Sequence, residues 1–294
     1  MQSGTSPDAT RSNASDDGPV MDEGAAADLV GREPQLARLD AVFRRLRHGR
    51  RATVLVTGEA GIGKTSLLRA AVGRAGCRVA WGACIDMDGA PGYWPWSQAL
   101  DSLVRDIGLP AALAAAGDDA GRLASIVPAF GTMSTGDASA RERLLLLDAA
   151  ARFLDSVAED VPVVVVLDDL HWADESSVAL FDFVARSSRP SPVALVAAYR
   201  HDELPPPVHA RLADLASRSE HVEVGGLDAG AVAALVARFA GTAVDAETAA
   251  AIHRRTGGHP FFVRELAFLP GTEVDEAVPV AVRDAIDRRL RRLP

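Results

Sequence analysis

The chain has 294 residues, of which 48% are hydrophobic and 24% charged, and its formal net charge is −9. This composition is typical of one large or two modest globular domains, and the acidic balance argues against a general nucleic-acid-binding surface. No apolar run approaches the ~20 residues of a membrane span, and no signal peptide opens the chain. Cys77 and Cys84 fit neither a zinc site nor a disulfide framework. We therefore expect a cytoplasmic protein.

The first predicted elements follow a polar tail. Residues 1–28 are mostly Gly, Ala, Ser and Asp, which is typical of a disordered segment. A helix is expected after Pro34, because apolar residues then recur at helical spacing. The β-branched run at 52–56 predicts a buried strand, and a second helical pattern begins at Thr65. A further short strand is expected at 78–81.

A glycine-rich loop joins the first strand to the second helix. Gly58, Gly63, Lys64 and Thr65 satisfy the pattern G-x-x-x-x-G-K-[ST], in which backbone N–H groups and the helix N-terminus surround a phosphate chain. Lys64 is the only lysine among the 31 Lys and Arg residues. A compact point charge is therefore kept where a planar guanidinium would not fit between phosphates. We prefer this nucleotide-phosphate site to the alternative of a glycine-rich turn that merely caps a helix.

Strands and helices alternate along the next part of the chain. After an aromatic, turn-rich stretch at 90–96, a helix is expected at 97–107, and the weak pattern at 111–137 suggests two short helices. The later elements expected are helices at 140–157, 175–187 and 205–217 and strands at 161–167, 191–199 and 221–224. This alternation predicts an α/β fold with a doubly wound parallel sheet. From residue 228 onward only helices are expected, at 229–240, 245–256, 260–269 and 279–293.

Two adjacent acids follow the most apolar strand. Asp168 comes directly after that strand, at the edge of a parallel sheet where ligands collect. With the hydroxyl of Thr65 it can complete a Mg²⁺ site on the terminal phosphates, and Asp169 can act as base toward the attacking water. Asp169 can also be a simple turn or cap residue. Arg200 ends the next strand and either touches the γ-phosphate or is a solvated loop arginine.

Five stretches of the sequence occur in a recognisable order. They are Leu29–Glu33, Gly58–Ser66, Val163–Asp174, Arg200 with Asp202-Glu203, and Thr256–Val263. Together they resemble the ATPase module of the STAND class of P-loop NTPases, as found at the front of large ATP-binding regulators of the LuxR family (MalT-like activators). The resemblance covers residues 29 to 294.

The resemblance implies a role for each matching residue. It implies an adenine-side motif at Val30, Gly31 and Arg32, and an adenine contact by Pro260 in a helical lid. The residues expected to bind nucleotide are Val30, Gly31, Arg32, Gly58, Glu59, Ala60, Gly61, Ile62, Gly63, Lys64, Thr65, Ser66 and Pro260. Those expected to hold the metal are Thr65 and Asp168, and those expected to take part in catalysis are Asp169, Lys64 and Arg200. His259 departs from the family, which more often has asparagine there.

These observations predict a P-loop NTPase core at 29–226, followed by an all-helical lid domain at 227–294. The expected function is an ATP- and ADP-binding, Mg²⁺-dependent and slowly hydrolysing switch, whose nucleotide state the resemblance links to self-association. The alternatives are a non-hydrolysing nucleotide-gated scaffold and a small-molecule P-loop kinase. Related regulators continue into a winged-helix domain and a DNA-binding domain, so we expect a fragment or remnant of a longer regulator, without DNA binding of its own. His171 and Trp172 could position water or pack a loop, and we prefer packing. The glycines at 257–258 are expected to stop a helix.

Overall fold

The computed structural model describes residues 29–87, 89, 91–131, 139–241 and 243–267. The expected disordered tail at 1–28 and the expected helix at 279–293 lie outside the described residues. The strands are β1 (Ala52–Gly58), β2 (Arg78–Ala83), β3 (Val163–Asp168), β4 (Val193–Tyr199) and β5 (Glu220–Val224). The helices are α1 (Glu33–Leu46), α2 (Lys64–Gly73), α3 (Trp94–Ile107), α4 (Leu109–Ala116), α5 (Ala120–Leu123), α6 (Ala140–Val157), α7 (Glu175–Ala185), α8 (Pro206–Ala216), α9 (Ala229–Ala240), α10 (Ala246–Thr256) and α11 (Pro260–Ala267).

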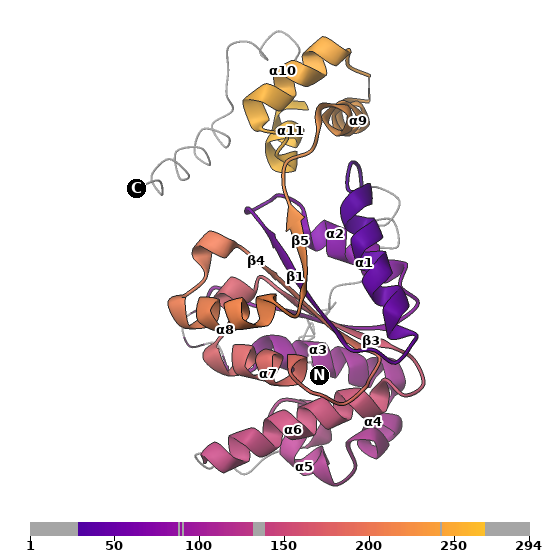
Figure 1. Ribbon diagram of the computed structural model, residues 1–294, viewed down its shortest axis with the longest axis vertical. Coiled ribbons are helices and arrows are strands. Elements are labelled where there is room, and N and C mark those ends of the chain that lie inside the picture. The colour runs from indigo at the N-terminus through magenta and orange to yellow at the C-terminus, as the bar shows by residue number, and fades with distance from the viewer. Residues whose placement is uncertain (1–28, 88, 90, 132–138, 242, 268–294) are drawn as a thin grey trace, which may run out of the picture.

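The strands form one parallel sheet in the order β2-β3-β4-β1-β5 (Figure 1). The first strand of the chain lies between the last two, with Ala52 opposite Ala194 and Val54 opposite Glu220. Because all the strands run the same way, their carboxyl ends meet along one edge of the sheet. Ligand sites in such sheets lie at that edge.

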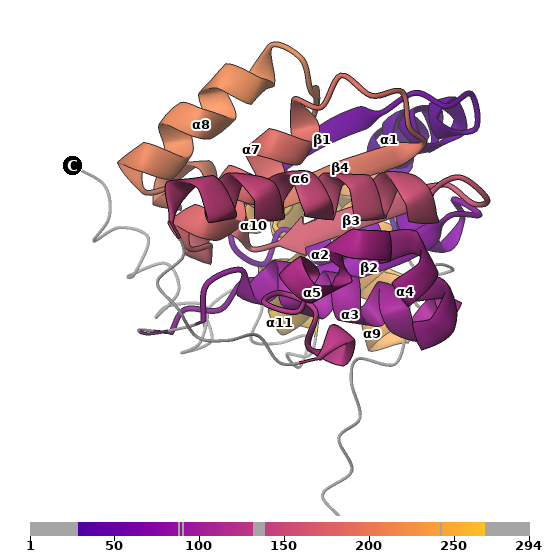
Figure 2. The ribbon, with the colours of Figure 1, turned by 90° about the horizontal axis from the view of Figure 1, so that it is seen from below.

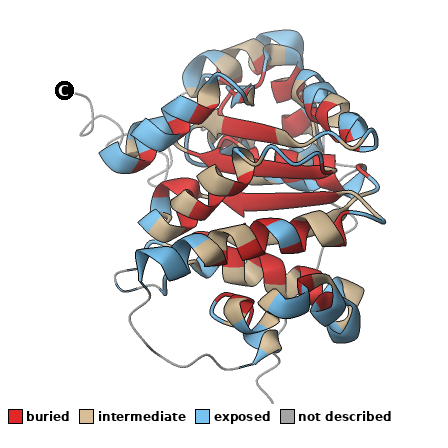
Figure 3. Ribbon diagram, turned by 60° about the horizontal axis from the view of Figure 1, so that its bottom comes forward, coloured by how far each residue is buried: buried red, intermediate tan, exposed pale blue. Residues whose placement is uncertain are grey.

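Two hydrophobic cores cover the two faces of this sheet. Successive side chains of β3 alternate between them: Val164 and Val166 pack with α1 and α2, whereas Val163 and Val165 pack with α3, α6, α7 and α8. Figure 2 shows the second layer, in which α4, α6, α7 and α8 follow one another across the sheet. Figure 3 shows the strands as the most buried part of the molecule. The predicted doubly wound α/β fold is confirmed.

Local sequence signals explain most element boundaries. Helix α6 begins and ends where expected, because Ser139 and Glu142 form a reciprocal capping box at its start. Helix α3 begins at Trp94, three residues earlier than expected, so the turn-rich stretch predicted at 90–96 is a turn at 92–93 but helical at 94–96. Proline is tolerated in a first helical turn, and the buried indole of Trp96 donates a hydrogen bond to the carbonyl of Ser177 at 2.9 Å.

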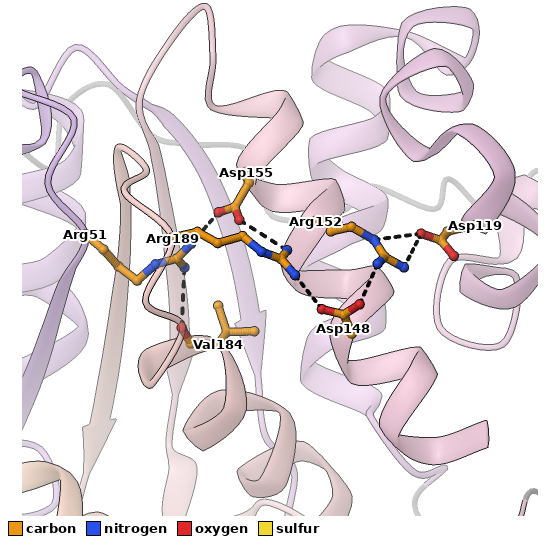
Figure 4. Close-up of polar contacts among 7 residues, drawn as sticks. All are labelled: Arg51, Asp119, Asp148, Arg152, Asp155, Val184 and Arg189. Atoms are coloured by element: carbon orange, nitrogen blue, oxygen red, sulfur yellow. Dashed lines mark hydrogen bonds and ion pairs between the residues drawn. The ribbon is translucent and has the colours of Figure 1, made fainter. Parts of the chain in front are cut away.

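A ladder of alternating charges lies at the amino end of the sheet (Figure 4). Its members are Arg51, Asp155, Arg189, Asp148, Arg152 and Asp119, joined in that order by ion pairs. The ladder connects the residue before β1 to α6 and to the loop before β4. Most of its members are partly exposed, so each pair contributes little alone, but Arg51 is only 8% exposed and is tied to the carboxylate of Asp155.

Helices α9, α10 and α11 lie beyond β5 and pack on one another around their own small core (Figure 1). Asp228 and Asp245 cap the first two of these helices. The chain returns to the start of α9 at Gly258, whose carbonyl accepts a hydrogen bond from the N–H of Leu227 at 2.8 Å. A Cβ on Gly258 would lie 1.9 Å from the carbonyl oxygen of Leu227, so only glycine permits this crossing. The crossing places the start of α11 beside the sheet edge.

Candidate functional site

The glycine-rich loop connects the end of β1 to the start of α2. Gly61 and Gly63 have φ angles of +71° and +100°, which glycine adopts without strain. The last loop residue, Gly63, is the N-cap of α2, so the first N–H groups of that helix lie at the loop. The loop therefore has the backbone turns and the free helix N-terminus that an anion site requires.

The lysine of the loop is folded back on it. Lys64 is buried, and its Nζ donates hydrogen bonds to the carbonyl oxygens of Gly58 at 3.0 Å and Glu59 at 2.9 Å. Burial lowers the pKa of Lys64, and the carboxylate of Asp169 works in the opposite direction. Two neutral carbonyl groups are weak partners for a buried ammonium, so an anion at this position would be favoured.

The next residue of the loop meets the end of β3. The hydroxyl of Thr65 donates a hydrogen bond to Oδ2 of Asp168 at 2.7 Å. Asp168 is only 4% exposed, and burial raises its pKa, while the hydrogen bond from Thr65 acts in the opposite sense. A hydroxyl and a carboxylate side by side are hard oxygen donors of the kind that Mg²⁺ prefers.

Asp169 occupies a different environment from its neighbour. Its backbone has a φ of 54°, which is uncommon for a non-glycine residue, and its N–H donates to Oδ1 of Asp168 at 3.1 Å. The carboxylate of Asp169 is 40% exposed, and its Oδ1 lies 3.9 Å from Nδ1 of His171. The left-handed backbone thus separates the two acids: one faces Thr65 and the other is open to solvent.

A second set of side chains, made of His171, Glu203 and Arg200, lies next to Asp169. The ring of His171 is buried, with Nε2 3.6 Å from a carboxylate oxygen of Glu203, and that carboxylate also pairs with Arg200 at 2.9 Å. Burial lowers the pKa of His171. Sequence reasoning assigned this histidine to packing, and its contact with two acids was missed. Trp172 is 40% exposed, and its ring lies 5.1 Å from the ring of His171, so it packs in part, as expected.

The sequence motif at 30–32 lies between the phosphate loop and helix α9 and contacts both. Val30 packs against the core of α9, α10 and α11, and Gly31 lies so close to Ala231 of α9 that a Cβ would be 2.3 Å from the Cβ of that alanine. The guanidinium of Arg32 is buried and donates to the carbonyl of Ile62 at 3.0 Å. Its contact is therefore with the loop backbone, a partner that the sequence did not reveal.

The start of α11 also touches the loop. Nε2 of His259 lies 2.9 Å from the carbonyl oxygen of Ala60, and Pro260 follows as the first residue of the helix. A Cβ on Gly61 would lie 3.3 Å from the ring of His259 and 3.4 Å from the side chain of Phe261. Residues expected to bind nucleotide, at 30–32, 58–66 and Pro260, thus lie near one another, and the loop also meets Asp168, expected to hold the metal.

Comparisons with known proteins agree with this architecture. The AAA ATPase domain model matches residues 28–196, which is more than half of the chain. No curated protein matches the sequence. Within the described residues, no helix is both long and apolar enough to cross a membrane.

Solved structures of similar fold were also found. A Signal Transduction ATPase with Numerous Domains (STAND) protein with a tetratricopeptide repeat sensor, from Pyrococcus horikoshii, has a TM-score of 0.52 and 15% identity. The similarity covers 89% of this chain and 32% of that protein, so the chain spans about a third of its length. A mutant RuvB from Thermotoga maritima has a TM-score of 0.46 and 13% identity, over 90% of this chain and 72% of that one. At these identities the likeness concerns the fold alone.

Proposed function

The chain belongs to the AAA ATPase domain family, and on that premise we propose that it is a switch module that binds ATP and ADP and hydrolyses ATP slowly. The observation that carries this proposal is the meeting of Lys64, the Thr65–Asp168 pair and the open carboxylate of Asp169 at the carboxyl ends of β1 and β3. Phosphoryl transfer needs little covalent chemistry from the protein, so positioning and charge are sufficient.

Thr65 and Asp168 would hold a magnesium ion with the nucleotide. Within the described residues, no group of three or more His, Cys, Asp or Glu side chains is arranged to hold a metal by itself. That fits Mg²⁺ in such sites, which takes one or two protein oxygens and completes its shell with phosphates and water. When bound, the ion supplies charge neutralisation on the terminal phosphates.

The remaining side chains divide the other tasks. Lys64 exchanges its two carbonyl partners for phosphate oxygens, which are stronger acceptors for an ammonium group. Asp169 has an ionisable carboxylate open to solvent, so it can orient a water molecule and take its proton. Arg200 is held by Glu203 across 2.9 Å, and a terminal phosphate competes with that carboxylate for the guanidinium.

We further propose that the module belongs to a LuxR-type transcriptional regulator, and that its nucleotide state controls self-association. The order of the motifs, from the stretch at 29–33 to that at 256–263, supports this assignment. DNA binding is expected to lie outside this chain, because its net charge is −9. The rival candidate is a nucleotide-gated scaffold in which the same acids hold magnesium but no hydrolysis occurs.

Two acid-to-amide variants test the proposal. Asp169→Asn should keep ATP affinity and lower single-turnover hydrolysis of bound ATP by roughly 10²–10⁴-fold, the usual range for a positioned base. Asp168→Asn should weaken Mg²⁺-ATP binding more than binding of metal-free nucleotide. The exposed Asp160, in the turn before β3, provides a control, and Asp160→Asn should behave as wild type.

The same variant allows the self-association step to be measured. Because Asp169→Asn is expected to retain ATP, its mass in light scattering should increase with ATP and stay that of a monomer with ADP. Equal single-turnover rates in wild type and Asp169→Asn would show that Asp169 is no base and would favour the scaffold. A mass independent of nucleotide would contradict the self-association proposal alone.

A further inference from the structure

Four carbonyl groups of the phosphate loop accept hydrogen bonds from side chains. The carbonyls of Gly58 and Glu59 accept hydrogen bonds from Lys64, which belongs to the same motif. The carbonyls of Ala60 and Ile62 are bonded from outside it, by residues far away in the sequence. Their donors are His259, at 2.9 Å, and Arg32, at 3.0 Å.

A bonded carbonyl fixes the whole peptide unit. Because the peptide is planar and trans, the N–H of the following residue points away from the carbonyl oxygen. Holding the oxygen of Ala60 therefore directs the N–H of Gly61, and holding the oxygen of Ile62 directs the N–H of Gly63. Within the described part of the chain, neither of these two N–H groups donates a hydrogen bond to the protein. Both are available to an acceptor in the loop.

We propose that Arg32 and His259 are positioning residues that orient the Gly61 and Gly63 N–H groups of the phosphate loop toward the phosphates of a nucleotide. This inference rests on the proposed function of nucleotide binding and deepens it. Neither side chain need touch the ligand, because each acts through a backbone carbonyl. The carbonyl oxygen of Ala60 can only accept, so Nε2 of His259 carries the proton.

The surroundings of the two side chains suit this role. Arg32 is only 3% exposed, and no carboxylate pairs with it in the described residues, so its guanidinium is committed to the loop. Burial lowers the pKa of Arg32, because its charge is poorly solvated there. A phosphate chain in the adjacent loop would offset that cost, since it brings negative charge next to a buried cation.

The ring of His259 is held in place by its own segment. Its backbone N–H donates to Thr256 at 3.1 Å, its carbonyl accepts from Val263 at 3.0 Å, and the ring lies 4.7 Å from that of Phe262. These contacts belong to α10 and α11, whereas the bonded carbonyl belongs to the loop after β1. Any displacement of α11 would therefore release the Ala60 peptide and reduce the loop's affinity for phosphate.

Carbonyl-carbon resonances of the labelled full chain test the inference, because they report hydrogen bonds that a carbonyl accepts. His259→Phe keeps a ring and loses the donor, so it should shift the Ala60 resonance and leave that of Ile62. Arg32→Met keeps the length of the side chain and should do the reverse. Each variant should weaken ADP binding about tenfold in calorimetric titration, as expected for the loss of one hydrogen bond. His259→Gln and Arg32→Lys retain a donor and should recover most of the wild-type affinity.

The outcomes separate this inference from the function on which it rests. Unchanged carbonyl resonances, or unchanged ADP affinity in both donor-free variants, would overturn the positioning role while wild-type binding still supports the switch. Equal weakening in the donor-retaining variants would also overturn it, because packing alone would then explain the loss. If wild type binds no ADP although both resonances shift as expected, the proposed function fails and the loop geometry stands.

Discussion

Gly31→Ala is the sharpest stability test of the contact between the segment before α1 and helix α9. Gly31 has a φ of +68°, and an added Cβ would lie 2.3 Å from the Cβ of Ala231 and 3.2 Å from Cδ2 of Leu227. Carbon atoms in contact are normally about 3.5–4 Å apart. The methyl group therefore cannot be accommodated unless the segment before α1 and the helix move apart.

Two terms contribute to the expected loss of stability. The left-handed backbone costs an alanine about 1–2 kcal/mol. Overpacking against a well-filled site adds about 1–3 kcal/mol. We therefore expect Gly31→Ala to lower the free energy of unfolding by about 2–5 kcal/mol. Gly49 is the matched control, because its φ is +70° but nothing lies within 4 Å of an added Cβ. Gly49→Ala should cost only the backbone term.

Urea unfolding followed by circular dichroism measures both variants. A second substitution isolates the clash: Ala231→Gly removes the methyl group that the new Cβ would meet, at about 1 kcal/mol of helix propensity. In the double variant we expect the two changes to be coupled favourably by about 1–3 kcal/mol. If Gly31→Ala loses no more stability than Gly49→Ala, the segment before α1 and α9 do not approach closely. Purely additive losses of stability in the double variant would lead to the same conclusion.

Two further predictions concern the site. Lys64→Arg should weaken ATP binding by at least about tenfold, or about 1.4 kcal/mol, because a planar guanidinium cannot replace the buried ammonium; near-normal affinity in calorimetric titration would contradict this. The pKa of His171 is lowered chiefly by burial, with further effects from the facing groups Asp169, Arg200, Glu203 and Lys64. The unfolded chain therefore binds this proton more readily, so the free energy of unfolding should fall as the pH drops through about 6.5. His171→Asn should lose less stability than wild type between pH 7.5 and 5.5 in urea titrations, and parallel losses would refute this.

Local patterns were sufficient to predict the fold class. The uninterrupted apolar run before Asp168 is typical of a strand buried on both faces, and β3 is buried at every residue. The glycine-rich loop, its lysine and the acid after β3 were also identifiable, because motif spacing and strand ends determine which side chains reach the same sheet edge. The structure brings Thr65 and Asp168 together at that edge.

Long-range contacts could not be predicted in the same way. Arg32 and Ile62 are 30 residues apart and Ala60 and His259 are 199 apart, and no local pattern specifies a side chain bonded to a distant carbonyl. The left-handed backbone of Asp169 was also hidden, because aspartate is compatible with several conformations after a strand. The contact between His259 and Ala60, in particular, depends on how the start of α11 meets the loop.

The sheet order also determines when β1 can pair during synthesis of the chain. Strand β1 pairs with β4 and β5, so about 140 residues separate Ala52 from its partner Ala194. At ~5–20 residues per second, a ribosome needs about 7–28 s to make that stretch. During this time the backbone N–H and C=O groups at the edges of β1 have no native partner, and the loop that follows β1 has no completed sheet to support it. Strand β1 is thus synthesised first but is among the last strands to be paired on both edges.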